Sequence, residues 1–246
     1  MRDVSRQVAF ITGGSKGIGR GVAQALVAAG MRVCVTGRDE ATLAASVALL
    51  ASAAPEDAGN GGPAAFGAVA DVRDPAALEA AVESTVARYG GIDLVVANAG
   101  VGRFGSIVEL APEAWHEVID TNLTGVFNTV KATVPALQAS SGLLVTIGSL
   151  AGANFFAGGS AYNASKFGLV GFSQAIMLDL RAHGVRVSTI MPGSVATHFS
   201  GREPAPDDAW KLQPDDVAEA VLYLARSEAR ALPSKIELRP SQPRRA

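Results

Sequence analysis

A tyrosine and a lysine stand four positions apart in the stretch AYNASKFG, residues 161–168. In a helix, side chains at this spacing lie on one face, a turn apart. An ammonium group about 4 Å from a phenol, at an effective dielectric constant near 20, favours the phenolate by roughly 4 kcal/mol. That energy equals about three pKa units and would bring a phenol of pKa about 10 close to neutrality. Tyr162 and Lys166 therefore have the types and spacing of a general acid and the cation that activates it. The stretch by itself is equally compatible with a chance pair on one face of a helix, so the rest of the chain has to decide.

A glycine-rich stretch, ITGGSKGIGRG at 11–21, follows the first apolar run of the chain. Glycine allows a sharp turn and lets a phosphate approach the backbone amides at a helix N-terminus. The glycines at 13, 17 and 19 do not have the G-x-G-x-x-G spacing, and no lysine stands where a P-loop needs one. We predict a phosphate-binding turn. A nucleophile elbow around Ser15 is disfavoured, because too little chain precedes it and the three histidines show no supporting pattern.

Short apolar runs alternate with helical patterns along the whole chain. Runs of this kind are expected when both faces of a parallel sheet are covered, and the alternation predicts right-handed crossovers. The fold class is therefore α/β, a doubly wound parallel sheet (Rossmann fold) of about seven strands with helices on both faces. The expected strands are 7–12, 32–36, 64–72, 92–100, 142–149, 185–193 and 235–238, and the first helices are about 18–30, 41–54 and 74–89.

The composition favours a single cytoplasmic domain spanning residues 1–246. The chain is 48% hydrophobic, which is ample for one core, and its net charge of −2 gives no argument for nucleic acid or an anionic membrane. Cys34 is the one cysteine and lies in an apolar run, which indicates a reducing compartment. No apolar run reaches membrane-spanning length. We expect a surface insertion at 55–63, a substrate loop at about 194–214 and a flexible tail at about 239–246.

Several short motifs, in order from about residue 6 to about 225, resemble those of the short-chain dehydrogenase/reductase family. ANAG at 97–100 is similar to the family's Asn-Asn-Ala-Gly element, with Ala97 in place of the first asparagine. After the last expected strand the chain lacks the family's common aspartate-glycine-glycine ending. The other matching motifs are Thr12-Gly13-x-x-x-Gly17-x-Gly19, DTNLTG at 120–125, IGSLAG at 147–152, Tyr162-x-x-x-Lys166 and PGSVAT at 192–197.

The resemblance implies an enzyme that reduces a carbonyl to a secondary alcohol by hydride transfer, with Tyr162 as proton donor. Ser149 would hydrogen-bond the substrate carbonyl, Lys166 would hold the nicotinamide ribose, and Asn122 would position a water that relays protons to Lys166. These side chains follow strands, where open α/β sheets bind ligands. The alternative is an NADP(H)-binding redox sensor without turnover, although such proteins typically lose the tyrosine or the lysine.

The end of the second strand favours NADP(H) as the cofactor. NAD-preferring relatives usually have an acidic residue there, but this chain has Gly37, followed by Arg38. Arg38, Lys16 and Ser15 suit a 2′-phosphate. NAD(H) would be preferred if Asp39 reached the ribose. No residue is assigned to a metal. The expected cofactor contacts are Gly13, Ser15, Lys16, Gly17, Ile18, Gly19, Arg38, Asp71, Val72, Asn98, Ala99, Gly100, Tyr162, Lys166, Pro192, Gly193, Val195 and Thr197.

The substrate is expected to be a small carbonyl compound or alcohol, with a 3-oxoacyl thioester on acyl carrier protein as one candidate. Arg103 and Arg202 are the cations that could meet an acidic carrier protein. Four aromatic residues are candidates for an apolar wall of the substrate site: Phe155, Phe156, Phe199 and Trp210. The resemblance also implies a homodimer or homotetramer, with helices at about 112–139 and 161–183 forming the dimer contact.

Overall fold

The computed structural model describes residues 2–55, 63–201 and 203–242. Within them, seven parallel strands form one sheet in the order β3-β2-β1-β4-β5-β6-β7, which confirms the predicted doubly wound fold. Residues 56–62 of the expected insertion and residues 243–246 of the expected tail lie outside the described residues. The strands are β1 (Val8–Ile11), β2 (Arg32–Gly37), β3 (Ala65–Val69), β4 (Leu94–Ala97), β5 (Leu143–Ile147), β6 (Arg186–Pro192) and β7 (Lys235–Leu238).

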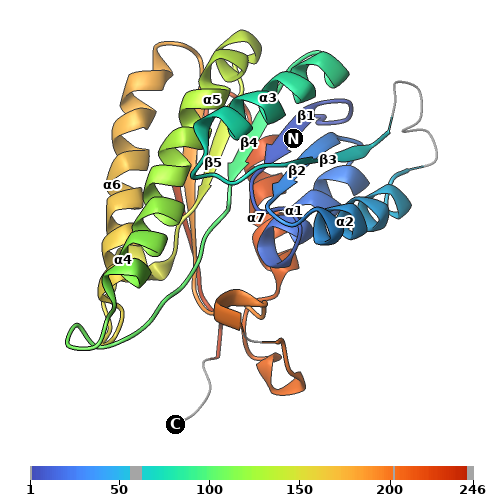
Figure 1. Ribbon diagram of the computed structural model, residues 1–246. Helices are drawn as coiled ribbons and strands as arrows, with labels where there is room; N and C mark the ends of the chain where they lie inside the picture. The colour runs from blue at the N-terminus through green and yellow to red at the C-terminus, as the bar shows by residue number, and fades with distance from the viewer. Residues whose placement is uncertain (1, 56–62, 202, 243–246) are drawn as a thin grey trace.

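Helices cover both faces of this sheet, with α1, α2 and α7 on one side and α3, α5 and α6 on the other (Figure 1). Successive side chains of a strand point to opposite faces, so Ile11 packs in one core and Phe10 in the other. Both residues are fully buried. The helices are α1 (Gly17–Ala28), α2 (Glu40–Ser52), α3 (Pro75–Tyr89), α4 (Pro112–Ile119), α5 (Gly125–Ser140), α6 (Ser160–Arg181) and α7 (Pro214–Arg226).

The fourth strand is shorter than the predicted 92–100 because the chain leaves the sheet after Ala97. The backbone N–H groups of Asn98 and Ala99 donate to the Thr12 hydroxyl, at 3.1 and 3.2 Å, instead of to a neighbouring strand. This side-chain contact ties the end of β4 to the end of β1. It thereby holds together β1 and β4, the two strands between which the strand order reverses. In open α/β sheets, ligands bind in the crevice at this point.

Two helical features were not predicted from the sequence. The helix at about 112–139 is interrupted by a π-helical turn, Asp120–Thr124, between α4 and α5. The second feature is α7, which packs on α1 so closely that a Cβ on Gly21 would lie 2.8 Å from the Cβ of Pro214. None of the helices in the described part of the chain combines the length and apolarity needed to cross a membrane.

Candidate active site

The glycine turn has a backbone geometry that other residues could adopt only with strain. Gly13 and Gly17 have φ of +67° and +54°, in the left-handed region, and a Cβ on Gly19 would lie 2.3 Å from the Gly13 carbonyl oxygen. Asn98 Nδ2 donates to the carbonyl oxygens of Thr12 and Gly13, at 2.9 and 3.0 Å. The turn at the start of α1 is therefore cross-linked to the end of β4. The sequence identified Thr12 only as part of a motif and not as this anchor.

Lys166 lies on α6 and reaches back to the end of β5. Its ammonium group donates to the carbonyl oxygen of Ile147 at 2.9 Å, and the residue is only 6% exposed. Burial disfavours the charged form and lowers the pKa of Lys166 from 10.5 to about 8. Lys166 can therefore gain or lose its charge close to neutral pH.

The pKa of Tyr162 differs from the expected one. It is raised above its ordinary value because burial penalises the phenolate, while a hydrogen bond with the Ser149 side chain acts in the opposite direction. Lys166 Nζ lies 5.8 Å from the centroid of the phenol ring and donates to Ile147. The prediction that the lysine brings this phenol close to neutrality is therefore wrong for the structure as it stands.

Ser149 follows β5 and caps the short 3₁₀ turn Leu150–Gly152. Its Oγ accepts a hydrogen bond from the Ala151 N–H at 3.1 Å. A hydroxyl that accepts from the backbone still has its own proton to donate. Ser149 and Tyr162 thus form a pair of hydroxyl groups at the carboxyl end of β5.

Asn122 lies inside the π-helical turn and is fully buried. Its Oδ1 accepts from the Val101 N–H at 2.8 Å, and its Nδ2 donates to the Val101 carbonyl and to the Ser165 hydroxyl, at 2.9 and 3.1 Å. Ser165 in turn donates to the Tyr162 carbonyl at 2.8 Å. The π-helical turn, a feature frequent at functional sites, thus connects the loop after β4 to the helix that carries Tyr162 and Lys166.

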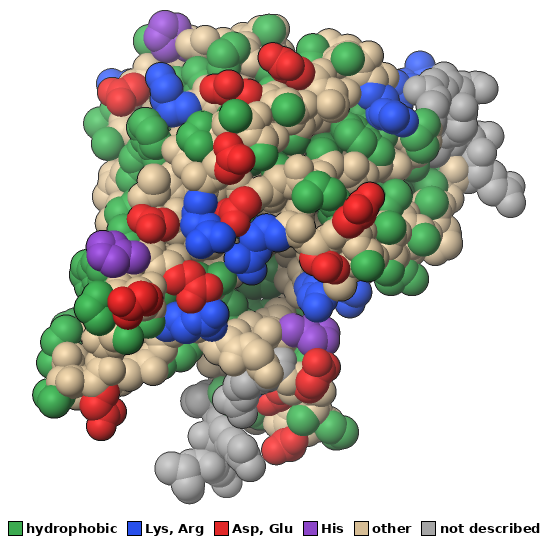
Figure 2. Space-filling model, in the orientation of Figure 1, with side chains coloured by type: hydrophobic (Ala, Val, Ile, Leu, Met, Phe, Trp, Pro, Cys, Tyr) green, Lys and Arg blue, Asp and Glu red, His purple; other side chains and the backbone are tan. Residues whose placement is uncertain are grey.

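Lys16 and Arg38 lie exposed at the mouth of the glycine turn. Ser15 belongs to the same corner, because a Cβ on Gly37 would lie 3.3 Å from its Oγ. Throughout the described ranges, no hydrogen bond or ion pair engages the side chain of Lys16 or Arg38. Figure 2 shows the hollow at this end of the molecule, with Lys and Arg side chains around it, interspersed with Asp and Glu.

Asp39, which would favour NAD(H) if it reached the ribose, caps α2. Its Oδ1 accepts from the Thr42 N–H at 2.9 Å. Hydrogen bonds with Thr42 hold the pKa of Asp39 below its ordinary value, and the nearby charge of Lys16 adds to the effect. The carboxylate therefore already has a structural role at the start of α2.

Asp71 and Val72, which the family resemblance places beside the adenine of the cofactor, have other partners in the structure. The Asp71 carboxylate accepts from the guanidinium of Arg73, with contacts of 2.6 to 3.1 Å. Val72 is 5% exposed, and its side chain faces Gly125, where a Cβ would lie 2.5 Å from Val72 Cγ2. Only the backbone of Val72 is left to meet a ligand, and its carbonyl already accepts from Asn128 at 2.9 Å.

The remaining predicted contacts surround the same crevice. Thr197 lies beside the glycine turn, 3.3 Å from where a Cβ on Gly17 would stand. Gly100 lies close to the Asn122 amide, and Ile18 packs into the core from the first turn of α1. Gly193, which follows Pro192 at the end of β6, donates its N–H to the Leu238 carbonyl at 2.8 Å. Val195 forms an isolated β-bridge with Leu212. The structure thus brings the cofactor and catalytic candidates to one end of the sheet.

Aromatic rings flank Tyr162 on two sides. The ring centroids of Phe104 and Phe199 lie 5.4 and 5.7 Å from that of Tyr162, both in edge-to-face contact. Phe156 contacts Phe104, with the two ring centroids 5.9 Å apart, and so extends this aromatic group. Phe104 is not among the four aromatic residues expected to form the apolar wall, although it begins the segment 104–110, which the sequence assigns to substrate specificity.

The other expected contacts of the substrate side are not found at Tyr162. Phe155 is 87% exposed, and Trp210 contacts the Lys211 ammonium. Arg103 binds Glu117 through two hydrogen bonds of 2.7 and 2.9 Å, so its charge is already paired and an acidic carrier would have to compete for it. Arg202 lies outside the described residues.

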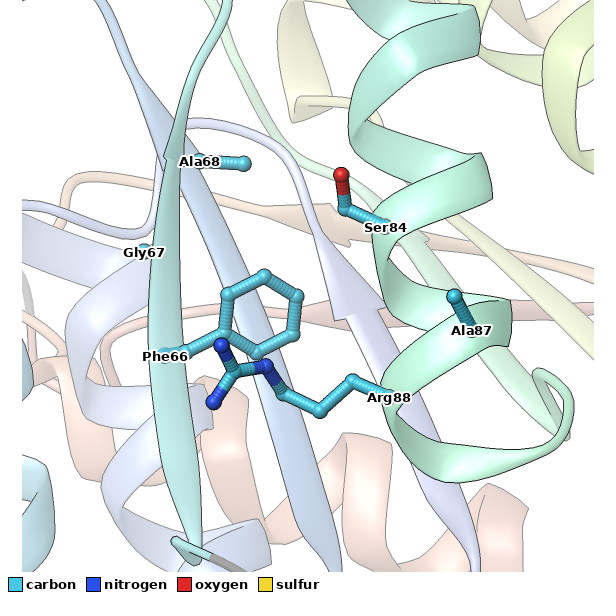
Figure 3. Close-up of a pocket in the computed structure, with 6 residues that line it drawn as sticks. All are labelled: Phe66, Gly67, Ala68, Ser84, Ala87 and Arg88. Atoms are coloured by element: carbon cyan, nitrogen blue, oxygen red, sulfur yellow. The ribbon is translucent and has the colours of Figure 1, made fainter.

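A separate groove of about 610 Å³ lies at the β3 edge of the sheet, between β3 and α3. Figure 3 shows the Arg88 guanidinium over the ring of Phe66, 4.8 Å from its centroid. Ser84 is its other polar side chain. The groove contains none of the predicted catalytic or cofactor-binding residues.

Comparison with known proteins assigns the family. A model of the short chain dehydrogenases matches residues 7–207. The chain belongs to the short-chain dehydrogenase/reductase family. Short-chain dehydrogenases of this kind are oxidoreductases, and this chain is therefore an enzyme that acts with a nicotinamide dinucleotide. The family membership inferred from the sequence motifs is confirmed.

Individual relatives cover nearly the whole chain of this short-chain dehydrogenase. It is 34% identical to the 3-oxoacyl-[acyl-carrier-protein] reductase of Synechocystis, over 94% of each chain. The structure of an alcohol dehydrogenase from Thermococcus sibiricus, complexed with 5-hydroxy-NADP, has a TM-score of 0.88 and 30% identity and covers 98% of this chain and 99% of its own. A metagenomic short-chain oxidoreductase in complex with NADP has a TM-score of 0.82 and 34% identity, over 98% and 100%.

Proposed function

We propose that this short-chain dehydrogenase reduces a carbonyl group to a secondary alcohol with NADP(H). The observation that carries the proposal is the meeting of three side chains at the end of β5. The Ser149 side chain lies close enough to Tyr162 to lower the pKa of the phenol, against the larger effect of burial, and the Lys166 ammonium group donates to the last carbonyl of the strand. The cross-linked glycine turn lies at the same end of the sheet.

The bound cofactor supplies the hydride to the carbonyl carbon and, once oxidised, a positive charge. In our proposal Tyr162 donates its proton to the carbonyl oxygen, and Ser149 donates a hydrogen bond to the same atom. Lys166 in its charged form stabilises the phenolate that remains. The amides of the turn between Gly13 and Gly19 would hold the diphosphate, since no Cβ blocks them.

Replacement of Tyr162 distinguishes this enzyme from a redox sensor. Tyr162→Phe removes the proton donor and keeps the ring contacts with Phe104 and Phe199. We expect the turnover number to fall by roughly 10²- to 10⁴-fold, with NADPH affinity retained. The measurement is NADPH oxidation with a panel of carbonyl compounds, beside a binding titration. An unchanged rate in the variant would remove the mechanism, and binding without turnover in wild type would favour the sensor.

We further propose that NADP(H) is preferred over NAD(H). No hydrogen bond or ion pair engages the side chains of Arg38 and Lys16 in the described part of the chain, and Asp39 is occupied as the cap of α2. Two cations beside a hydroxyl favour a 2′-phosphate. Relatives bound to NADP or its derivative share the fold over nearly the full chain.

A pair of titrations tests the cofactor preference. Arg38→Leu should weaken NADPH binding by about tenfold or more, because a charge-assisted contact of about 1.5–3 kcal/mol is lost, and should leave NADH binding nearly unchanged. Arg88→Leu is the matched control, since Arg88 is an exposed arginine in the separate groove between β3 and α3. Equal affinity of wild type for NADH and NADPH would contradict the preference.

The aromatic surroundings of Tyr162 favour an uncharged, apolar carbonyl substrate. Phe104 and Phe199 occupy two sides of the phenol, and Arg103 is paired with Glu117. A 3-oxoacyl thioester is the second candidate, because the Synechocystis relative is a 3-oxoacyl-[acyl-carrier-protein] reductase. Comparing kcat/KM for cyclic ketones and for 3-oxoacyl thioesters, free and carrier-bound, separates the two.

A further inference from the structure

Asn163, next to Tyr162 on α6, is buried at 8% exposure and uses its amide on a different segment of the chain. Its Nδ2 donates to the carbonyl oxygens of Ala151 and Asn154, at 2.8 and 2.9 Å. Its Oδ1 accepts from the Phe156 N–H at 3.3 Å. Only this orientation of the amide pairs donors with acceptors at all three positions. One side chain thus holds the backbone of 151–156 in three places.

The segment held by Asn163 is the one that orients Ser149. Ala151 receives the Asn163 amide at its carbonyl and donates its own N–H to Ser149 Oγ at 3.1 Å. The Ser149 side chain lies close enough to the phenol to lower the pKa of Tyr162, against the larger effect of burial. The contacts therefore close a ring from Tyr162 through its covalent neighbour Asn163, Ala151 and Ser149 back to the phenol.

Close packing makes this ring stiff. A Cβ on Gly152 would lie 2.7 Å from the Lys166 carbonyl oxygen, so the 3₁₀ turn lies directly on α6. A Cβ on Gly159 would lie 2.5 Å from Asn163 Oδ1. The same Asn163 contact places Phe156, whose ring meets Phe104.

We propose that Asn163 is a positioning residue that sets the Ser149 hydroxyl relative to the Tyr162 hydroxyl, so that both reach one carbonyl oxygen. The proposal rests on the proposed reduction, in which those two groups act together. A donor displaced by about 1 Å can cost roughly 100-fold in rate, so a side chain that fixes this separation controls turnover without touching the substrate.

A double-mutant cycle with Ser149 tests the proposal. Asn163→Ala should lower kcat by roughly 10- to 100-fold and leave the Kd for NADPH within about twofold of wild type. In a Ser149→Ala background, Asn163→Ala should cost little more, because the group that it positions is already gone. Asn163→Asp keeps the volume but turns carboxylate oxygens toward two carbonyls, so its loss should be at least as large.

Asn154→Ala is the matched control. Asn154 is exposed in the same segment, and its side chain makes one bond, to the Leu150 carbonyl at 3.2 Å. Its kcat should stay close to wild type. Amide hydrogen exchange of residues 149–157, measured without substrate, should accelerate in Asn163→Ala and remain slow in Asn154→Ala.

Each outcome has a separate meaning. Equal losses from Asn163→Ala in the wild-type and Ser149→Ala backgrounds would overturn the positioning role, as would an Asn163→Asp variant with wild-type kcat. A loss of NADPH binding in step with kcat would also overturn it, since a general structural defect would then explain the result. Absence of turnover in wild type with every carbonyl compound would instead reject the proposed function.

Discussion

At the scale of single residues, burial and charge compete at Tyr162 and Lys166. Burial raises the pKa of the phenol and lowers that of the ammonium group to about 8. Both shifts favour the neutral forms, which is the reverse of an activated phenolate beside a permanent cation. Ser149 is the contact that favours the phenolate in this structure. In this structure, burial therefore favours the protonated form of Tyr162, which we propose as the proton donor.

The lowered pKa of Lys166 predicts a pH dependence of carbonyl reduction. Lys166 is charged below about pH 8 and neutral above it. In our proposal Lys166 stabilises the phenolate only in its charged form, so we expect kcat/KM to fall as the pH rises through about 8. Lys166→Arg keeps the charge and should move the fall to higher pH.

A profile of kcat/KM from about pH 6 to about pH 10 tests this dependence. Lys131→Arg, at an exposed position of α5, is the control and should match wild type. A flat wild-type profile over that range would contradict the role of Lys166. The same group also affects stability: between about pH 8 and its ordinary 10.5 the unfolded chain holds more protons, so its contribution to folding becomes more favourable as the pH rises.

At the scale of elements, the position of a residue in or beside a helix determines which task its side chain has. Asp39 belongs to the start of α2, where its carboxylate accepts from Thr42. Asn122 belongs to a π-helical turn between α4 and α5 and connects the loop after β4 to α6. Neither task follows from residue type alone, because aspartate and asparagine serve equally well in caps, turns and binding sites.

Asp39→Ala tests whether this carboxylate caps α2 or contacts the cofactor. Loss of the cap should lower the midpoint of thermal unfolding, because the first-turn N–H of Thr42 loses its partner. The ratio of NADPH to NADH affinity should stay within about twofold of wild type, and Asp39→Asn should recover most of the stability. A large gain or loss of NADH affinity would show that Asp39 reaches the ribose.

At the scale of the whole molecule, α5 and α6 leave apolar side chains on the surface. Phe127, Phe167 and Leu178 are 48%, 44% and 53% exposed, and the ring of Phe127 packs edge-on to Phe172 at 6.3 Å. Large apolar side chains grouped on one face favour contact with another protein surface. We propose that this face forms the homodimer that the sequence predicts for these helices.

Phe167→Glu places a charge in the proposed dimer contact and should shift the protein to monomer. Leu49→Glu is the control, since Leu49 is equally exposed, at 48%, but lies on α2 on the opposite face of the sheet. Light scattering after size exclusion gives the mass of each variant. A monomeric wild type, or a dimer that survives Phe167→Glu, would contradict the proposed face.

The sequence alone determined the order of strands and helices, because a sheet covered on both faces requires apolar runs that are visible residue by residue. It also singled out Tyr162 and Lys166, because their spacing is a local property of a helix, and the resemblance of its motifs to the short-chain dehydrogenase/reductase family added Ser149 as a candidate. The tertiary structure decided the rest. The pKa shift of Tyr162 depends on which groups pack around the phenol. Likewise, Phe104 and Asn163 acquire their contacts only when loops distant in the chain meet α6.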